Sequence, residues 1–131
     1  QNILSTVTPG TTISETESNN TTATANNIAT SNTTVNGTMS SSTDVDYFKV
    51  TIPAGKTLKA VLTPNSTSDY DLELYSSTGT KLTSSTNGTG AADTVTNANT
   101  GTTDKVVYAK VIYYSGGTGS TNGKYTLNFT W

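Results

Sequence analysis

The stretch DYFKVTIPAGKTLKAVL, residues 46–62, contains two runs of alternating apolar and polar residues on either side of a turn. Side chains of a strand point alternately to its two faces, so the apolar residues of the first run share one face: Phe48, Val50 and Ile52. The turn at 53–56 holds a Pro and a Gly, and the second run repeats the pattern with Leu58, Ala60 and Leu62. The stretch therefore predicts a β-hairpin with one face in a hydrophobic core.

Three further segments carry strand patterns that belong to the same kind of fold. In residues 69–75 the apolar side chains share one face, and the acids Asp69, Asp71 and Glu73 share the other. Residues 105–114 are the most apolar part of the chain and predict a central strand covered on both faces. Residues 125–131 alternate once more. With turn signals between roughly six to nine short strands and no long helical period, the sequence predicts an all-β fold, an antiparallel β-sandwich.

The composition excludes several classes of function. Thr, Ser and Asn account for 31, 15 and 13 of the 131 residues, which suits exposed strand faces and turns. His and Cys are absent, and this excludes His- and Cys-dependent catalytic triads, disulfides and zinc sites with the usual ligands. The 7 basic residues are all Lys and the net charge is −2, which argues against nucleic acid as a partner. The apolar runs are too short to cross a bilayer, so no membrane partner is expected.

The acidic residues form close pairs. Glu15/Glu17, Asp44/Asp46 and Asp69/Asp71 have i, i+2 spacing, which puts both carboxylates on one side of an extended chain. Such a pair can hold a hard cation or act as a general acid and base, and it can also be a solvated strand face. Catalysis is disfavoured, because paired catalytic carboxylates must flank a cleft that small sandwich domains seldom build. We therefore expect that the chain is not an enzyme.

Tyrosines are the other candidate binding groups. Tyr113 and Tyr114 are neighbours on one predicted strand, so one of them points outward or into the rim. An exposed Tyr anchors a flat polymer well, because it offers contact area at a low entropy cost. The alternative is that each Tyr covers the core and keeps its hydroxyl group in water.

Four short motifs follow one another along about residues 13–131. They are ETESNN at 15–20, VNGT at 35–38 with DVDYF at 44–48, DYDLELY at 69–75, and the closing pattern from Tyr108 through YYSG at 113–116 to YTL at 125–127. In this order they resemble the bacterial pre-peptidase C-terminal (PPC) domain family, which includes the collagen-binding domains of clostridial-type collagenases. The first motif is similar to the family's E-x-E-x-N-[ND] pattern and the third to its D-x-D-L-x-L-y pattern. Each motif is weak alone, whereas the four in order are fairly specific.

The resemblance implies a jelly-roll β-sandwich over residues 14–131, preceded by a linker or lead-in segment at 1–13. It also implies a calcium site built from the 15–20 segment and the residues before the 46–52 strand. Carried over residue by residue, the ligands are Glu15, Glu17, Asn19, Asn20, Thr38 and Asp44, with Asp46 as a neighbour that adds an oxygen. Such a mixture of carboxylates and neutral oxygens is what calcium prefers. Asn20 stands where an Asp is common, and residues 40–43 lack an acid of the collagen-binding members, which lowers the charge of the site.

The resemblance further implies a role in targeting. In the collagen-binding members a set of tyrosines on one sheet face grips the triple helix; Tyr114 matches one of them, whereas Ile112 stands where another Tyr is expected. We expect a secreted, extracellular, monomeric accessory domain of a hydrolase, in particular a protease. Its partners would be an insoluble polymer, collagen or a polysaccharide, and the catalytic domain of the parent enzyme. The candidate substrate-binding residues are Tyr75, Tyr113 and Tyr114.

Two alternatives stay open at this point. A carbohydrate-binding module of a glycoside hydrolase would stack sugars on aromatic side chains drawn from Tyr75, Tyr113, Tyr114 and Trp131. A domain that aids secretion or folding of its parent enzyme would bind no polymer. The feature that discriminates them is whether several aromatic side chains line one exposed face.

Overall fold

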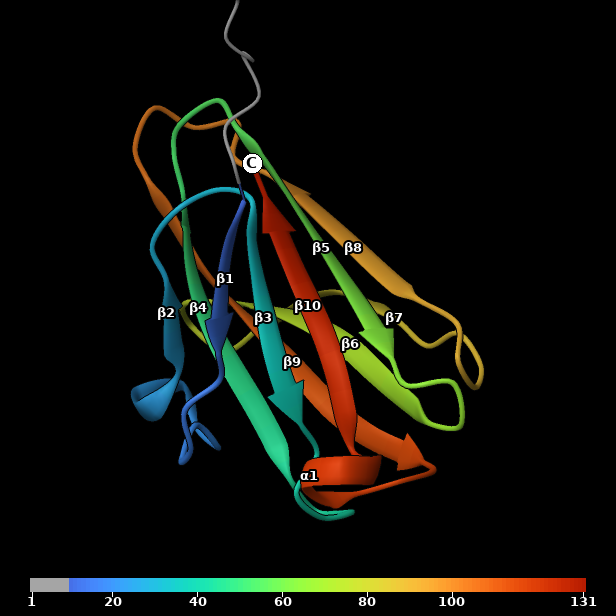
Figure 1. The fold of residues 1–131 in the computed structure, drawn as a ribbon. Coiled ribbons are helices and arrows are strands. Elements are labelled where there is room, and N and C mark those ends of the chain that lie inside the picture. Colours follow the sequence, from blue (N-terminus) through green and yellow to red (C-terminus); the bar gives the residue numbers. More distant parts are fainter. Residues whose placement is uncertain (1–9) are drawn as a thin grey trace, which may run out of the picture.

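The computed structural model describes residues 10–131 as two five-stranded sheets packed face to face (Figure 1). The β10 sheet contains, in spatial order, β1 (Thr11–Ser14), β3 (Thr33–Thr38), β10 (Lys124–Thr130), β5 (Thr57–Pro64) and β8 (Asp93–Ala98). The β9 sheet contains β2 (Asn26–Ile28), β4 (Val45–Ile52), β9 (Lys105–Ser115), β6 (Asp69–Ser76) and β7 (Lys81–Ser85). The predicted all-β sandwich is confirmed, and residues 10–131 form ten strands rather than the expected six to nine.

Most strand pairs are antiparallel, as predicted, but each sheet also has one parallel pair. β1 runs parallel to β3 and β2 runs parallel to β4, so both sheets are mixed. Two short helical turns complete the described residues, a 3₁₀ turn η1 (Thr22–Thr24) and α1 (Gly119–Asn122). No helix among residues 10–131 is long and apolar enough to cross a membrane.

The hairpin predicted from residues 46–62 is wrong. β4 pairs with β2 and β9, whereas β5 pairs with β10 and β8, so the turn at 53–56 carries the chain from one sheet to the other. Gly55 takes φ +78 in this turn, and Lys56 N–H donates to the Pro53 carbonyl over 3.1 Å. The apolar faces of both strands do line the core. The two faces oppose one another across the core. Alternation shows which face of a strand is buried but not which strand lies beside it, so the pattern could not distinguish this arrangement from a hairpin.

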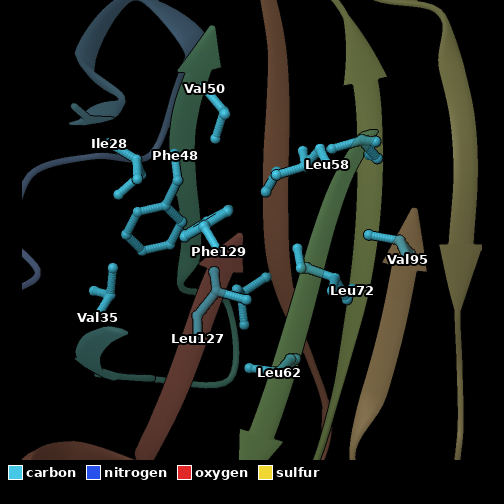
Figure 2. Close-up of a cluster of buried hydrophobic side chains, with 14 of the residues drawn as sticks. Ile28, Val35, Phe48, Val50, Leu58, Leu62, Leu72, Val95, Leu127 and Phe129 are labelled. Carbon is cyan, nitrogen blue, oxygen red and sulfur yellow. The ribbon is translucent and has the colours of Figure 1, made fainter. Parts of the chain in front are cut away.

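The core lies between the sheets and is made of the alternating residues of nearly every strand (Figure 2). Phe48 of β4 and Phe129 of β10 meet across it with ring centroids 6.0 Å apart. The prediction that β9 is central is confirmed, because β4 and β6 flank it. The prediction that β9 is covered on both faces is wrong: its inward residues are buried, and its outward residues are half-buried or exposed, because nothing in the described part of the chain forms a further layer over that face.

The predicted lead-in segment, residues 1–13, reaches the sandwich at β1. Ile13 lies opposite Val35 in the parallel β1–β3 pair and packs against the core. Residues 1–9 lie outside the described part of the chain.

Candidate functional site

Three acidic side chains from the first and second motifs come together at the β1 edge of the sandwich. Glu15 directly follows β1, Glu17 lies two residues further on, and Asp46 belongs to β4 of the opposite sheet. One carboxylate oxygen of each residue lies within 4.8 Å of one oxygen of each other residue. Glu17 is exposed, Glu15 is half-buried, and Asp46 is fully buried on the inward face of β4. We call Glu15, Glu17 and Asp46 the first acidic cluster.

Backbone pairing places Glu15 in this cluster. Its own N–H donates to the Asn36 carbonyl over 2.9 Å, which continues the β1–β3 pairing by one residue. Its carboxylate accepts from the N–H of Thr38 over 2.6 Å and from the side-chain amide of Asn19 over 2.9 Å. Glu15 is therefore held on both oxygens, and Thr38 contributes its backbone N–H to the cluster.

Asn19 ties the acidic segment to β4. Its carbonyl accepts from the N–H of Tyr47 over 2.9 Å, and its side-chain amide also donates to Asn26 Oδ1 over 3.1 Å. The side chain of Asn26 in turn exchanges two hydrogen bonds with the backbone of Thr16. The residue sequence analysis missed here is Asn26, since nothing marks it among the 13 asparagines of the chain.

Asp46 is the buried end of the cluster. Tyr125 of β10 donates its hydroxyl to Asp46 Oδ2 over 2.6 Å, and Asp46 Oδ1 is buried without any hydrogen-bond partner. Burial raises the pKa of Asp46 to about 10, and the neighbouring charges of Glu15 and Asp44 act in the same direction. Burial, together with Asp46, also raises the pKa of Tyr125 well above its usual range. Tyr125, which the sequence placed only in an alternating segment and in the closing motif, is thus also a partner of the site.

The charge of Glu17 is disfavoured as well. Loss of solvent around its carboxylate, followed by the charges of Asp44 and Glu15, raises the pKa of Glu17 above its ordinary value. A bound cation would relieve this repulsion, because an opposite charge at a few ångströms favours the ionised carboxylate.

The remaining predicted ligands lie beside the cluster. Asp44 Oδ2 accepts from the N–H of Ser40 over 2.8 Å, which closes the loop before β4. With its side-chain amide oriented so that the nitrogen faces the neighbouring acceptors, Asn20 donates to the Val45 carbonyl over 2.7 Å and to Asp44 Oδ1 over 3.2 Å. The structure therefore brings Asp44 next to Glu17 and Asp46, while its own oxygens are engaged by neighbouring residues.

Two orphaned oxygens show that the first acidic cluster fits a hard cation. Asp46 Oδ1 and Asn19 Oδ1 are buried and have no hydrogen-bond partner, although buried polar atoms are almost always paired. Carboxylate and amide oxygens are ligands that calcium prefers, and the cluster holds no nitrogen or sulfur ligand that would select zinc.

The tyrosines divide between the core and the outer face of the β9 sheet. Tyr114 is 69% exposed, whereas Tyr113 packs against the core beside Tyr70 and donates its hydroxyl to the Gly116 carbonyl. The expectation that the two residues point to opposite faces is confirmed, and the structure turns the candidate Tyr113 inward.

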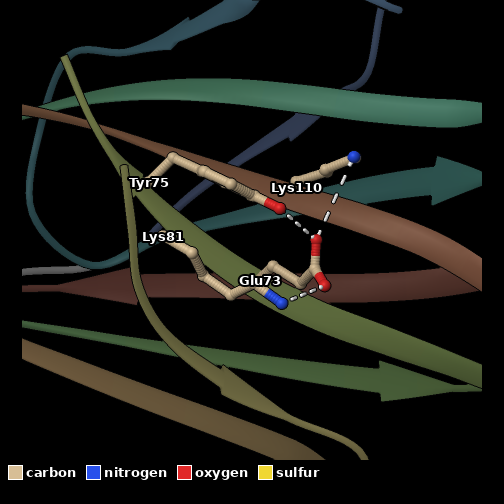
Figure 3. A network of polar contacts seen from close by, with 4 residues as sticks. All are labelled: Glu73, Tyr75, Lys81 and Lys110. Carbon is tan, nitrogen blue, oxygen red and sulfur yellow. Dashed lines mark hydrogen bonds and ion pairs between the residues drawn. The ribbon is translucent and has the colours of Figure 1, made fainter. Parts of the chain in front are cut away.

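Tyr75 belongs to a charged network on the outer face (Figure 3). Its hydroxyl donates to Glu73 over 2.7 Å, and the same carboxylate pairs with Lys81 at 3.2 Å and Lys110 at 4.0 Å. The hydrogen bond to Glu73, together with burial, raises the pKa of Tyr75 to about 12. Although burial opposes it, the bonds from Tyr75 and Lys81 hold the pKa of Glu73 below its ordinary value.

Further aromatic rings lie around this network. The ammonium of Lys110 sits 5.6 Å from the ring centroids of both Tyr47 and Tyr75, and Tyr108 is the strand partner of Tyr75. We call the set Tyr47, Tyr75, Tyr108 and Tyr114 the tyrosine face. Sequence analysis missed Tyr47 and Tyr108, although the alternation of residues 46–52 already placed Tyr47 on the outward side.

A hollow with a volume of about 520 Å³ lies over β3, β5 and β10, on the other sheet. Its lining holds no Asp or Glu: Asn36, Gly37, Thr38, Thr63, Pro64, Asn65, Lys124, Tyr125 and Thr126. No residue of the first acidic cluster or of the tyrosine face lines this hollow, although Thr38 and Tyr125, which donate hydrogen bonds to Glu15 and Asp46, do.

Comparison with known proteins bears on the fold. No protein-family model and no curated protein matches the sequence. A similar solved structure is the pre-peptidase C-terminal domain of collagenase from Bacillus anthracis, with 16% identity and a TM-score of 0.60 over 81% of this chain and 94% of that one. The resemblance indicated by the four motifs is confirmed for the fold: the chain has the β-sandwich fold of a pre-peptidase C-terminal domain.

Proposed function

We propose that the chain is a non-catalytic accessory domain of a secreted hydrolase, in particular a protease, and that it holds its parent enzyme on an insoluble polymer. The fold supports this, because the similar structure is an accessory domain of a collagenase. The observation that carries the proposal is the tyrosine face, which gathers four aromatic side chains on the uncovered side of the β9 sheet. As a monomer tethered to a catalytic domain, it would raise the local concentration of enzyme at the polymer surface.

The tyrosine face suits an extended polymer. Tyr114 offers a freely exposed ring at the end of β9, while Tyr75 is held rigid by Glu73, so little side-chain entropy is lost on binding. Lys110, Lys81 and Glu73 add donors and acceptors between the rings. Collagen and a polysaccharide both present such alternating apolar and polar groups, and collagen is the polymer we favour from the similar structure.

We expect that alanine substitution of Tyr114 weakens polymer binding at least about tenfold, because exposed aromatic anchors carry most of the binding free energy of such interfaces. The measurement is a pull-down of the isolated domain on insoluble collagen, chitin and cellulose, with casein as a soluble control. Thr126→Ala, an exposed residue on the other sheet, is the matched control and should bind like the unmutated domain.

The pull-down also separates the candidate functions. Retention on collagen alone supports protease targeting, and retention on chitin or cellulose alone replaces it with a carbohydrate-binding module. No retention on any polymer would reject targeting and leave a role in secretion or folding of the parent enzyme.

We also propose that the first acidic cluster binds calcium. Glu15, Glu17 and Asp46 would hold the ion together with the amide oxygen of Asn19, and the neighbouring charge of Asp44 would favour a cation there. The bound charge would neutralise the crowded carboxylates and fix the 15–20 segment between the two sheets. At about 100 times the dissociation constant, binding would add about 2.7 kcal/mol to the free energy of unfolding.

Glu17→Gln should reduce calcium affinity by about tenfold or more, because one of three ligand charges is lost. Glu17 is exposed, so stability in EDTA should change little. Isothermal titration calorimetry and thermal unfolding with and without calcium measure both quantities. Asp104→Asn, an exposed acid in the β8–β9 connection, is the control; equal calcium affinity of Glu17→Gln and Asp104→Asn would contradict the assignment.

A further inference from the structure

Two buried carboxylates lie at one end of the tyrosine face. Asp69 and Asp71 of β6 are on the same side of the β9 sheet as Tyr75, because alternate residues of a strand share a face. The two acids are each only 8% exposed, which is less than the other outward residues of β6. We call Asp69 and Asp71 the β6 acid pair, and it is part of the face that we propose binds a polymer.

The two carboxylates of the β6 acid pair contact each other. Asp69 lies within hydrogen-bonding reach of Asp71, and Oδ1 of each residue is buried without a hydrogen-bond partner. Two carboxylates in such contact cannot both stay charged unless a positive charge or a proton compensates them. One shared proton turns one carboxyl group into a donor to the other, which is what a hydrogen bond between them requires.

The neighbouring strands add negative charge to the pair. Burial is the largest cause that raises the pKa of Asp71 to about 6, and the contact with Asp69 is the next. The charges of Asp93 on β8 and Glu73 on β6 act in the same direction. These charges favour the protonated pair, because a like charge nearby disfavours the ionised carboxylate.

The protein supplies the pair with no compensating cation. Within residues 10–131 the ammonium groups that lie within 4.0 Å of a carboxylate are those of Lys81 on β7 and Lys110 on β9, and both pair with Glu73. The loop segments that adjoin the pair contain no charged side chain: 65–68, 86–92 and 116–118. A shared proton is therefore the partner that the surroundings leave to the pair.

The β6 acid pair borders a β-bulge that contains Tyr114. Asp69 pairs with Ser115 of β9. The next residue of β6, Tyr70, pairs with Tyr113, so β9 has one residue more than β6 at this step. The extra residue is Tyr114, which is 69% exposed. Because a bulge bends its strand and re-aims a side chain, the position of the Asp69 backbone affects how Tyr114 is presented.

We propose that the β6 acid pair is a pH switch of the tyrosine face: a shared proton holds the β6–β9 step beside Tyr114, and loss of that proton separates the carboxylates and loosens the step. The regulatory role rests on the proposed function, because the tyrosine face is the surface that the pair regulates. An unfolded Asp releases its proton near pH 4, whereas the folded Asp71 has a pKa of about 6. The stability that the proton contributes is complete below the lower value and is lost as pH rises through the higher one, so polymer binding should weaken over this range.

A pull-down on insoluble collagen at about pH 5 and about pH 7.5, at one fixed calcium concentration, measures the switch. We expect the unmutated domain to bind at least about threefold more tightly at the lower pH. Asp71→Asn replaces the titrating acid with an amide that always donates to Asp69, so it should bind equally at both pH values and as tightly as the unmutated domain in acid. Asp104→Asn, an exposed acid far along the sequence, is the control and should keep the full pH dependence.

Backbone NMR tests the switch without any polymer. The amide signals of Asp69 and Tyr114 should follow one titration with a midpoint at about pH 6 in the unmutated domain. In Asp71→Asn the same signals should not titrate in this range, whereas Asp104→Asn should titrate like the unmutated domain.

The two measurements separate failure of the switch from failure of the proposed function. If no polymer is retained at either pH but Tyr114 titrates through Asp71, the proposed function is rejected and the coupling of the pair to Tyr114 is supported. If polymer is retained with the same pH dependence in Asp71→Asn as in the unmutated domain, the switch is overturned and targeting stands. A Tyr114 signal that does not titrate, or that titrates unchanged in Asp71→Asn, also overturns the switch.

Discussion

Gly37→Ala should lower the free energy of unfolding by about 2–5 kcal/mol, one of the two largest effects expected in this domain. Gly37 of β3 lies opposite Tyr125 of β10, and both face the interior. A Cβ on Gly37 would collide with the ring and hydroxyl atoms of Tyr125. The φ of Gly37 is not positive, so the whole effect comes from this steric conflict.

Displacing Tyr125 also costs a buried hydrogen bond. Its hydroxyl is the donor to Asp46 Oδ2, and the other oxygen of Asp46 already lacks a partner. Moving the ring would leave the Asp46 carboxylate without any donor, which adds about 1–3 kcal/mol to the cost of overpacking. The effect of one methyl group at Gly37 thus reaches the first acidic cluster.

Urea denaturation of Gly37→Ala and of a control glycine measures this cost. Gly88→Ala is suited as the control, because no atom lies within 4 Å of the added Cβ and its φ is not positive. The control should stay within about 0.5 kcal/mol of the unmutated domain. A loss of less than about 1 kcal/mol in Gly37→Ala would show that Tyr125 can move freely and would contradict its role as the partner of Asp46.

Much of the fold was predictable because alternation reports burial directly. The inward residues of β4, β5, β6 and β10 were identified from period-2 patterns alone. Strand pairing was not predictable in the same way. β4 and β5 are joined by a short turn and still lie in different sheets, since a turn with Pro and Gly can close a hairpin or cross between sheets. Which of the two occurs depends on the strands that pair with β4 and β5 from distant parts of the chain, here β9 and β10.

Only those residues of the candidate sites that lie in short sequence motifs were predictable. Spacing and the PPC resemblance pointed to Glu15, Glu17 and Asp46, which the fold does bring together. The roles of Tyr125 and Asn26 could not be predicted. Tyr125 contacts a residue 79 positions away and Asn26 contacts one 10 positions away, and both residue types are common throughout the chain.

Asp46→Asn should stabilise the metal-free domain at neutral and alkaline pH. The raised pKa of Asp46, about 10, means that the folded chain keeps a proton which the unfolded chain releases near pH 4. A group whose pKa is raised in this way contributes stability that is complete below the unfolded pKa and is lost as pH rises toward the folded one. Asn cannot ionise and still offers an oxygen to Tyr125, so the variant should gain at least about 2 kcal/mol relative to the unmutated domain at about pH 8.

The same substitution should have the opposite effect once calcium is present. Asn supplies a neutral ligand in place of a carboxylate, so calcium affinity at the first acidic cluster should fall by about tenfold or more. Thermal unfolding at about pH 5 and about pH 8, in EDTA and in millimolar calcium, separates the two effects. The unmutated domain should lose stability with rising pH in EDTA and recover it with calcium, whereas Asp46→Asn should lose less stability with rising pH and gain less from calcium. If Asp46→Asn instead lowers stability in EDTA at both pH values, the Asp46 side chain is a hydrogen-bonded structural group and not a ligand for a cation.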